Sequence, residues 1–202
     1  MYESKITVLI LAAGGSSRLG QPKQLLPWKS SNLLQHTLDT VDEINSYETV
    51  LVLGANYNEI FSEINTKEIH VVHNKSWYKG LGHSIAVGVK YIKESIPETE
   101  ATLIMLADQP LISDMYLLKM ISEFKTGTQQ IIASTYKNKK LGVPALFDNY
   151  YFEALMQLND DEGAKHIIKA NFKKVELLVN DINNKDIDTI EDYKQLYKAN
   201  HQ

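Results

Sequence analysis

The chain has 202 residues, of which 44% are hydrophobic and 23% charged, and its formal net charge is −4. This length can bury one sizeable core, so a single domain over residues 1–202 is expected. A mildly acidic chain lacks the basic face typical of nucleic-acid binders, so no nucleic-acid partner is expected. The absence of cysteine excludes disulfides, zinc–thiolate sites and a cysteine nucleophile, and favours a cytoplasmic location. No signal-peptide pattern or membrane-length apolar run is found, so no membrane partner is expected.

Apolar runs that predict buried strands alternate with segments of helical spacing along the chain. Strands are predicted at residues 6–11, 49–53, 69–73, 101–106, 130–136, 144–147 and 175–179. Helices are predicted at residues 33–44, 58–64, from 80 onward, from 113 onward, and at 150–158, 163–170 and 189–199. Such alternation predicts an α/β fold with a mainly parallel sheet covered on both faces. Ligands of these sheets bind beyond the carboxyl ends of the strands, where Gly14, Gly54, Asn74 and Asp108 are expected.

The first predicted strand leads into a glycine-rich loop from Leu11 to Lys23. Glycines let backbone N–H groups approach a ligand closely, and the loop adds serine hydroxyls and the cations Arg18 and Lys23. This composition predicts a triphosphate-binding loop whose cations stabilise a departing pyrophosphate. The alternative is an ordinary strand-to-helix turn with two solvated cations. The spacing matches neither the Walker loop nor the dinucleotide-binding fingerprint.

Two carboxylate motifs are candidates for a divalent metal site. Asp108 follows the strand at 101–106, where its carboxylate could reach a Mg²⁺ that also binds phosphate oxygens. Asp186 and Asp188 alternate before the last predicted helix, and either could complete this site. The alternatives are structural, because Asp108 could cap a turn, and Asp188 or Thr189 could cap the last helix.

Two further turns are candidates for substrate contact. Residues 80–84 read Gly-Leu-Gly-His-Ser before a helix, where a flat ligand could approach and Ser84 could contact a base edge. Ser84 could equally be a simple N-cap. Residues 160–165 read Asp-Asp-Glu-Gly-Ala-Lys, which is either an acidic helix start favoured by the helix dipole or a substrate-contacting turn.

Together these motifs resemble the MobA-like nucleotidyltransferase family over almost the whole chain. The strongest match is Leu-Ala-Ala-Gly-x-Ser-x-Arg-x-Gly-x-Pro-Lys-x-Leu-Leu-Pro at residues 11–27. The resemblance implies a single-domain, Rossmann-like three-layer fold of the nucleotide-diphospho-sugar-transferase type with a mostly parallel sheet. It implies catalytic roles for Arg18, Lys23 and Asp108, and metal contacts by Asp108 and Asp188. The implied nucleotide contacts are Leu11, Ala12, Ala13, Gly14, Gly15, Ser16, Arg18, Lys23, Gly82 and Ser84, and the implied acceptor contacts are Gly142, Pro144, Gly163 and Lys165.

Within that family the chain is most similar to molybdenum cofactor cytidylyltransferases. This similarity implies transfer of CMP from CTP to molybdenum-bearing molybdopterin, with Mg²⁺ as cofactor and pyrophosphate as product. Ala13 favours CTP, because pyrimidine-transferring relatives often read Ala-Ala-Gly here and a methyl group narrows the pocket against a purine. Ala107, Val143 and Lys165 depart from the family pattern, so the acceptor side fits less well than the nucleotide side.

Three alternatives stay open at this point. A cytidylyl- or uridylyltransferase acting on a sugar phosphate or methylerythritol phosphate would keep the fold and the nucleotide motifs. A non-catalytic accessory protein, with a molybdenum hydroxylase as candidate partner, would not need an intact metal site. A dinucleotide-binding oxidoreductase is disfavoured, because its glycine spacing is missing and Gly54-Ala55-Asn56 stands where a ribose-binding acid is expected.

Overall fold

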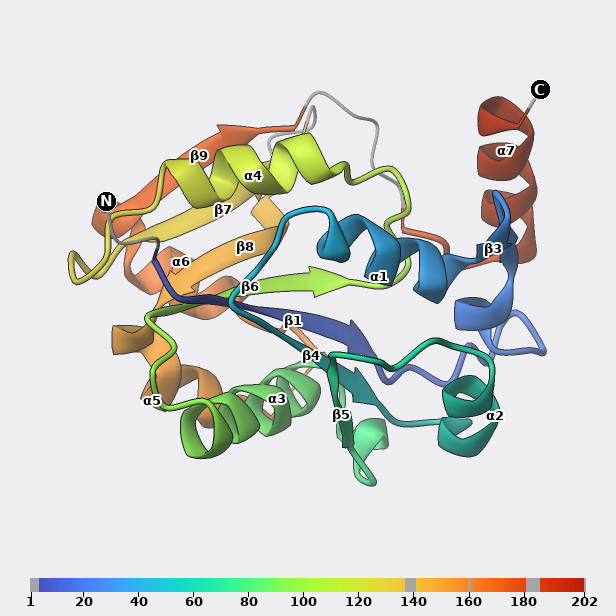
Figure 1. Cartoon of the computed structure of the whole chain (residues 1–202), viewed down its shortest axis with the longest axis horizontal. Coiled ribbons are helices and arrows are strands. Elements are labelled where there is room, and N and C mark those ends of the chain that lie inside the picture. The colour runs from blue at the N-terminus through green and yellow to red at the C-terminus, as the bar shows by residue number, and fades with distance from the viewer. Residues whose placement is uncertain (1–3, 137–140, 160, 181–185, 202) are drawn as a thin grey trace.

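A seven-stranded sheet forms the centre of the molecule (Figure 1), of which the computed structural model describes residues 4–136, 141–159, 161–180 and 186–201. The strand order is β5-β4-β1-β6-β8-β7-β9. Only β8 among these seven runs antiparallel to its neighbours, which confirms the predicted α/β fold with a mostly parallel sheet. The strands are β1 (Ile6–Ala12), β4 (Glu48–Leu53), β5 (His70–His73), β6 (Ala101–Leu106), β7 (Ile131–Thr135), β8 (Leu141–Asp148) and β9 (Val175–Val179).

Helices cover both faces of this sheet, as Figure 1 shows. Helices α1, α2 and α4 bury their apolar residues in one cluster, and α3, α5 and α6 bury theirs in a second cluster on the opposite face. The resulting three layers explain why the central strands are apolar on both sides. The helices are α1 (Leu33–Asp42), α2 (Tyr57–Ser62), α3 (Leu81–Ser95), α4 (Asp114–Ser122), α5 (Phe152–Met156), α6 (Lys165–Ala170) and α7 (Ile190–Asn200), with 3-10 turns η1 (Lys23–Leu25), η2 (Trp77–Lys79), η3 (Asn149–Tyr151) and η4 (Phe172–Lys174).

Two predicted helix starts are confirmed by their capping hydrogen bonds. The Ser113 side chain accepts from the backbone N–H of Tyr116 at the start of α4. At the start of α7, Thr189 and Asp192 form a reciprocal capping box. Since Thr189 is the cap of α7, Asp188 is not needed for that role, and the capping alternative for Asp188 is wrong.

Several predicted boundaries are wrong. The strand placed at 144–147 begins at Leu141, and its register against β7 shifts between Ala133 and Ser134, near Pro144, which has no N–H to donate. The helix placed at 150–158 is split into η3 and α5, and the helix placed at 163–170 begins at Lys165. Strand β9 has the predicted bounds, and it is an edge strand whose residues are mostly exposed.

A two-stranded hairpin was not predicted at all. It consists of β2 (Pro27–Trp28) and β3 (Ser31–Asn32), which pair antiparallel between η1 and α1. Two-residue strands have no periodicity that a sequence pattern can reveal. The hairpin carries Trp28, which is 1% exposed and anchors a third, smaller apolar cluster. Among the described residues, no helix is long and apolar enough to cross a membrane.

The sheet order brings the predicted loops to one edge. Strand β1 lies between β4 and β6 and is parallel to both, with Leu11 opposite Leu106. The backbone N–H of Ala107 donates to the Leu11 carbonyl at 3.2 Å, and that of Ala55 donates to the Ala13 carbonyl at 3.1 Å. The glycine-rich loop and Asp108 therefore leave the sheet side by side, although Lys23 and Asp108 are 85 positions apart in the sequence.

Candidate nucleotide and metal site

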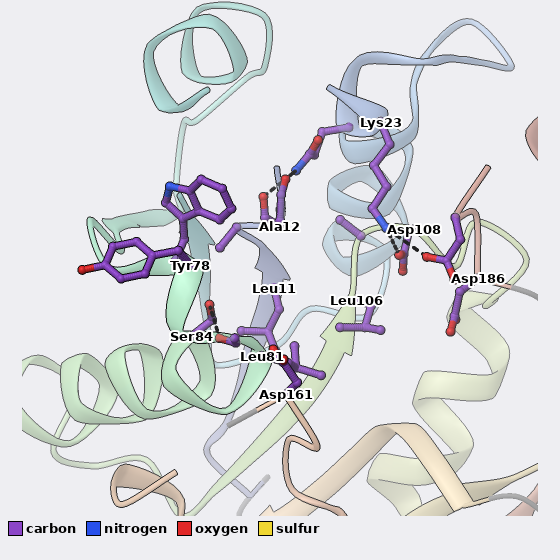
Figure 2. A pocket seen from close by; sticks show the side chains of 17 residues that line it. Leu11, Ala12, Lys23, Tyr78, Leu81, Ser84, Leu106, Asp108, Asp161 and Asp186 are labelled. Carbon is purple, nitrogen blue, oxygen red and sulfur yellow. Dashed lines mark hydrogen bonds and ion pairs between the residues drawn. The ribbon is translucent and has the colours of Figure 1, made fainter. Parts of the chain in front are cut away.

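A cavity of about 410 Å³ opens at this edge of the sheet (Figure 2). This volume lies within the range of small-molecule sites. One wall is the end of β1 and its loop, the facing wall is the first turn of α3, and Asp108 lies at the end of β6. Its lining residues include Leu11, Ala12, Ala13, Gly14, Lys23, Gln24, Trp77, Tyr78, Ser84, Asp108, Asp186 and Asp188.

The glycine-rich loop is held in shape by hydrogen bonds from within the same segment. Gln24 is 2% exposed, and its amide nitrogen donates to the carbonyls of Ala12 at 2.7 Å and Gly14 at 3.1 Å. Ser16 has a left-handed φ of 50°, and its hydroxyl accepts from the Lys23 backbone N–H at 3.0 Å. Sequence reasoning missed Gln24, because a single polar residue in a segment without periodicity carries no signal for a buried amide.

Only part of the loop faces the cavity. Leu11 to Gly14 and Lys23 line it, whereas Gly15, Ser16 and Arg18 do not. Ser16 is used to shape the loop. Arg18 is exposed and makes no hydrogen bond or ion pair with any residue that the structure describes, so its expected contact with phosphate stays a prediction.

Trp77 explains why Gly15 is a glycine. A Cβ atom on Gly15 would lie 2.9 Å from the Trp77 ring, and one on Gly54 would lie 2.5 Å from the Trp77 Cβ. The indole therefore fits over the ends of β1 and β4, and its neighbour Tyr78 is 72% exposed at the cavity wall. Neither aromatic residue was singled out from the sequence, because a Trp-Tyr pair outside a periodic segment carries no specific signal.

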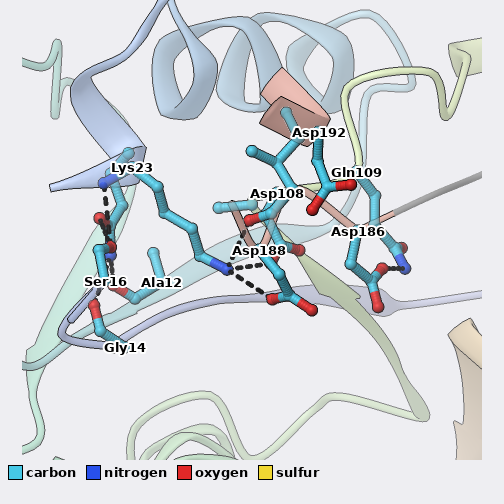
Figure 3. Close-up of polar contacts among 12 residues, drawn as sticks. Ala12, Gly14, Ser16, Lys23, Asp108, Gln109, Asp186, Asp188 and Asp192 are labelled. Atoms are coloured by element: carbon cyan, nitrogen blue, oxygen red, sulfur yellow. Dashed lines mark hydrogen bonds and ion pairs between the residues drawn. The ribbon is translucent and has the colours of Figure 1, made fainter. Parts of the chain in front are cut away.

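The central polar contact of the site joins the loop to β6 (Figure 3). The ammonium group of Lys23 donates to the Oδ2 atom of Asp108 in an ion pair. It also donates to the Ile187 carbonyl at 3.3 Å and lies 3.9 Å from the Oδ1 atom of Asp188. The Lys23 and Asp108 side chains are only 20% and 12% exposed. The structure thus brings together three residues that the sequence assigned to one site: Lys23, Asp108 and Asp188.

Asp108 lies in an environment that penalises its negative charge. Burial raises the pKa of its carboxyl, Lys23 opposes this effect, and the charges of Asp186 and Asp188 raise the pKa further. Its Oδ1 atom is buried and has no hydrogen-bond partner among the described residues. A buried carboxylate with an unpartnered oxygen and acidic neighbours would be stabilised by a divalent cation.

These residues fit a Mg²⁺ or Mn²⁺ ion that shares its coordination with a phosphate ligand. Within the described part of the chain, no three His, Cys, Asp or Glu side chains converge as a metal site. Magnesium is usually held by one or two carboxylates together with substrate phosphates and water, so a three-residue cluster is not required. Asp108 and Asp188 already face one cation, the Lys23 ammonium. One oxygen of Asp186, Oδ1, accepts from the Gln109 amide at 2.8 Å, which leaves Asp186 one oxygen fewer for a metal.

The predicted base-contacting turn differs from expectation in one respect. Helix α3 begins at Leu81, so Gly82 and Ser84 lie inside its first turn, and Ser84 is not the N-cap. Gly82 is buried and does not line the cavity. Ser84 lines the cavity, but its hydroxyl accepts from Asn74 at 3.0 Å and lies 3.4 Å from the Gly80 carbonyl. The buried Asn74 therefore positions Ser84 from the end of β5.

A second cavity, of about 450 Å³, adjoins the first. Asp186, Asp188 and three leucines line both of them. Of the predicted acceptor residues, Gly142 and Lys165 line this second cavity, whereas Pro144 and Gly163 do not. Gly163 serves the backbone instead, because its φ is 63° and a Cβ there would lie 3.1 Å from Leu81. Asp160, the first residue of the acidic turn, lies outside the described residues.

This arrangement defines a class of α/β protein that can bind an anionic ligand between a loop cation and strand-end carboxylates. The model of the MobA-like NTP transferase domain matches residues 8–175. The chain therefore belongs to the MobA-like NTP transferase domain family, a family of nucleotidyltransferases.

Individual relatives differ in their stated activities. The chain is 27% identical to the nicotine blue oxidoreductase of Paenarthrobacter nicotinovorans, over 96% of this chain and 95% of that protein. It is 25% identical to a probable molybdenum cofactor guanylyltransferase of Bacillus mycoides strain KBAB4, over 79% and 76% of the two chains. The crystal structure of Rv0371c from Mycobacterium tuberculosis H37Rv is 28% identical and matches with a TM-score of 0.86, covering 98% and 100% of the chains. A second Rv0371c structure, with a TM-score of 0.82 and 26% identity over 97% and 100%, is a complex with manganese.

Proposed function

We propose that this protein transfers the CMP group of CTP to a molybdopterin-type acceptor and releases pyrophosphate. The observation that carries this proposal is the pair of adjoining cavities that share Asp186 and Asp188. A transferase needs its donor and its acceptor in contact at the reacting phosphorus, and two cavities that meet at Asp188, the second metal ligand in this proposal, provide such a junction.

The first cavity is the donor site in this proposal. Lys23 and the backbone of residues 11–14 contact the triphosphate, and Arg18, an exposed residue of the same loop, contacts its outer phosphates. Tyr78 and Trp77 form an aromatic wall for the nucleoside. Ala13 supports CTP as donor, since its methyl group leaves less room for a purine. The Bacillus relative is a guanylyltransferase by name, so GTP is the donor to be tested against CTP.

The reaction is an in-line displacement at the α-phosphorus. An oxygen of the acceptor phosphate forms a bond to this phosphorus, and the bond to the bridging oxygen of pyrophosphate breaks. No protein nucleophile is needed, because the acceptor phosphate is already ionised at neutral pH. Lys23 offsets charge that builds on the departing pyrophosphate. Catalysis then rests on positioning and on fixed charge.

Asp108 and Asp188 would hold the metal in this scheme. A bound Mg²⁺ or Mn²⁺ supplies positive charge to the phosphate oxygens and orients the donor. Asp188 is the better second ligand, because it faces the same cation as Asp108, whereas Asp186 is bonded to Gln109. The manganese complex of the Mycobacterium structure supports a divalent metal in this family.

The second cavity is the acceptor site, contacted by Gly142 and Lys165. Pro144 and Gly163 do not line this cavity, and in this proposal they only set the backbone conformation of the segments beside it. A sugar phosphate or methylerythritol phosphate remains the alternative acceptor. The phosphate ester of either compound would present the same attacking oxygen.

An oxidoreductase is the second candidate function, because the relative that matches over 96% of this chain carries that name. Lys23 paired with Asp108 at the end of β6 favours nucleotidyl transfer, since a hydride transfer needs no strand-end metal carboxylate. Consumption of a reduced nicotinamide dinucleotide in the presence of a coloured aromatic acceptor, without pyrophosphate release, would favour the oxidoreductase.

The test is a pyrophosphate-release assay that crosses CTP, GTP, UTP and ATP with molybdopterin and several sugar phosphates. We expect release with CTP and molybdopterin, and near-complete loss in Lys23→Ala and in Asp108→Ala. Near-native turnover by either variant would show that the assigned roles are wrong.

A further inference from the structure

The segment that carries Asp186 and Asp188 is held at the site by its own apolar cluster. Ile187 lies between these two aspartates and is 1% exposed, whereas both aspartates are exposed. The Ile187 side chain packs in what we call the Trp28 cluster, whose buried members are Leu26, Trp28, Leu33 and Ile187. Tyr193, Leu196 and Tyr197 of α7 pack against the same cluster.

The backbone of Ile187 contacts both members of the central ion pair. Its N–H donates to the Asp108 carbonyl at 3.4 Å, and its own carbonyl accepts from the Lys23 ammonium at 3.3 Å. One residue therefore connects the strand end, the loop cation and the Trp28 cluster.

Helix α7 is fastened to the hairpin that carries Trp28, and Figure 1 shows it beside β3. The Trp28 ring packs nearly perpendicular to the rings of His201, at a centroid distance of 4.8 Å, and of Tyr197, at 6.1 Å. The Tyr193 hydroxyl donates to the Pro27 carbonyl at 2.8 Å. His201 accepts from the backbone N–H of Lys29 at 3.0 Å. The hairpin follows directly after η1, which begins at Lys23, so these contacts fix α7 relative to the loop cation.

The ion pair alone cannot hold Asp188 in place. Asp188 is 58% exposed and lies 3.9 Å from the Lys23 ammonium, and exposed pairs of this kind contribute little. Burial of the neighbouring isoleucine is the stronger constraint on the segment. We infer that Ile187 and α7 are positioning elements that present Asp188 to the metal and keep Lys23 beside Asp108. This inference rests on the proposed function.

The test is Mn²⁺ binding measured by electron paramagnetic resonance with a non-hydrolysable CTP analogue present, so that no turnover is required. Ile187→Ala is expected to weaken Mn²⁺ binding about tenfold or more, as losses of ligand-orienting partners do, and to match Asp188→Asn. The double variant is expected to be no weaker than either single variant, because both changes remove one interaction. Ile187→Val, which keeps most of the buried side chain, is expected to restore binding.

The matched control is Ile92→Ala, which truncates a fully buried isoleucine of α3 in the opposite-face cluster. It is expected to lower the melting temperature without changing Mn²⁺ affinity. If Ile187→Ala does not fold, His201→Ala at the end of α7 replaces it, and weaker Mn²⁺ binding is again expected.

Undiminished Mn²⁺ binding in Ile187→Ala, or in the replacement variant, overturns the positioning role. If Asp188→Asn also binds Mn²⁺ normally, Asp188 is not a ligand and the inference is overturned with it. Failure of the proposed function is a separate result, namely that the wild-type protein releases no pyrophosphate with any donor and acceptor.

Discussion

Replacing Asp108 by Asn is expected to lower activity about 100- to 1,000-fold without destabilising the fold. Burial raises the pKa of Asp108 above the usual value of 3.8 despite the nearby Lys23. The folded protein therefore binds this proton more tightly than the unfolded chain does. The Asp108 carboxyl therefore adds to the free energy of unfolding at pH values below its pKa in the unfolded chain. This stabilisation is lost as the pH rises through its pKa in the folded protein. At neutral pH the ionised carboxylate is a cost that the amide avoids.

The expected magnitudes follow from the contacts of Lys23. In the variant its ammonium keeps the Ile187 carbonyl at 3.3 Å and Asp188 at 3.9 Å, so Lys23 is not left as an unpaired buried charge, the case that costs about 3–5 kcal/mol. The neutral amide also removes the cost of a buried negative charge beside Asp186 and Asp188, which offsets the lost pair. The melting temperature should thus stay within roughly 2–4 °C of wild type or rise. The kcat/KM should fall about 100- to 1,000-fold, or roughly 3–4 kcal/mol.

The assay pairs pyrophosphate release with thermal unfolding at pH 7.5 and pH 5. The control is Asp42→Asn, an exposed aspartate at the end of α1, which should resemble wild type in both measurements. Any stability gain of Asp108→Asn should shrink at pH 5, where wild-type Asp108 is more protonated. A marked loss of stability at pH 7.5, or turnover near wild type, would refute this reasoning.

Three further predictions concern the nucleoside wall, the loop and one histidine. Tyr78→Ala should weaken CTP binding by about 1–3 kcal/mol in calorimetry, as lost stacking does, with Tyr78→Phe unaffected; equal binding in all three would exclude the aromatic wall. Gly15→Ala should destabilise the fold by about 1–3 kcal/mol in urea titration, because its methyl group would meet Trp77 at 2.9 Å; unchanged stability would contradict the close fit. Burial and nearby Lys29 lower the pKa of His36, so the free energy of unfolding should fall as the pH drops below about 6.5; His36→Gln should reduce that slope, and an unchanged slope would count against it.

The sequence predicted the elements of the site better than their contacts. Apolar runs ending in Gly14 and Asp108 placed both residues at strand ends, because parallel buried strands have a distinctive composition. The sequence alone could not predict that Lys23 pairs with Asp108, because that contact depends on which strands are neighbours in the sheet. The antiparallel direction of β8 also depends on pairing across the sheet, and no local pattern encodes it.

The polar residues of the loop also have contacts that the sequence could not predict. Arg18 and Lys23 are equal as cations in the sequence, yet only Lys23 is fixed, by Asp108 and the Ile187 carbonyl. Gln24 gave no functional signal, although it donates to two carbonyls of the loop. Such roles follow from tertiary contacts, so they required the structure.

Metal-dependent pyrophosphate release from CTP in the presence of a molybdopterin-type acceptor tests the central claim most directly. The account predicts release that requires both the acceptor and Mg²⁺ or Mn²⁺, that is faster with CTP than with GTP, and that disappears in Lys23→Ala. Binding of CTP without release, across every acceptor tested, would contradict the claim that this site is a nucleotidyltransferase centre.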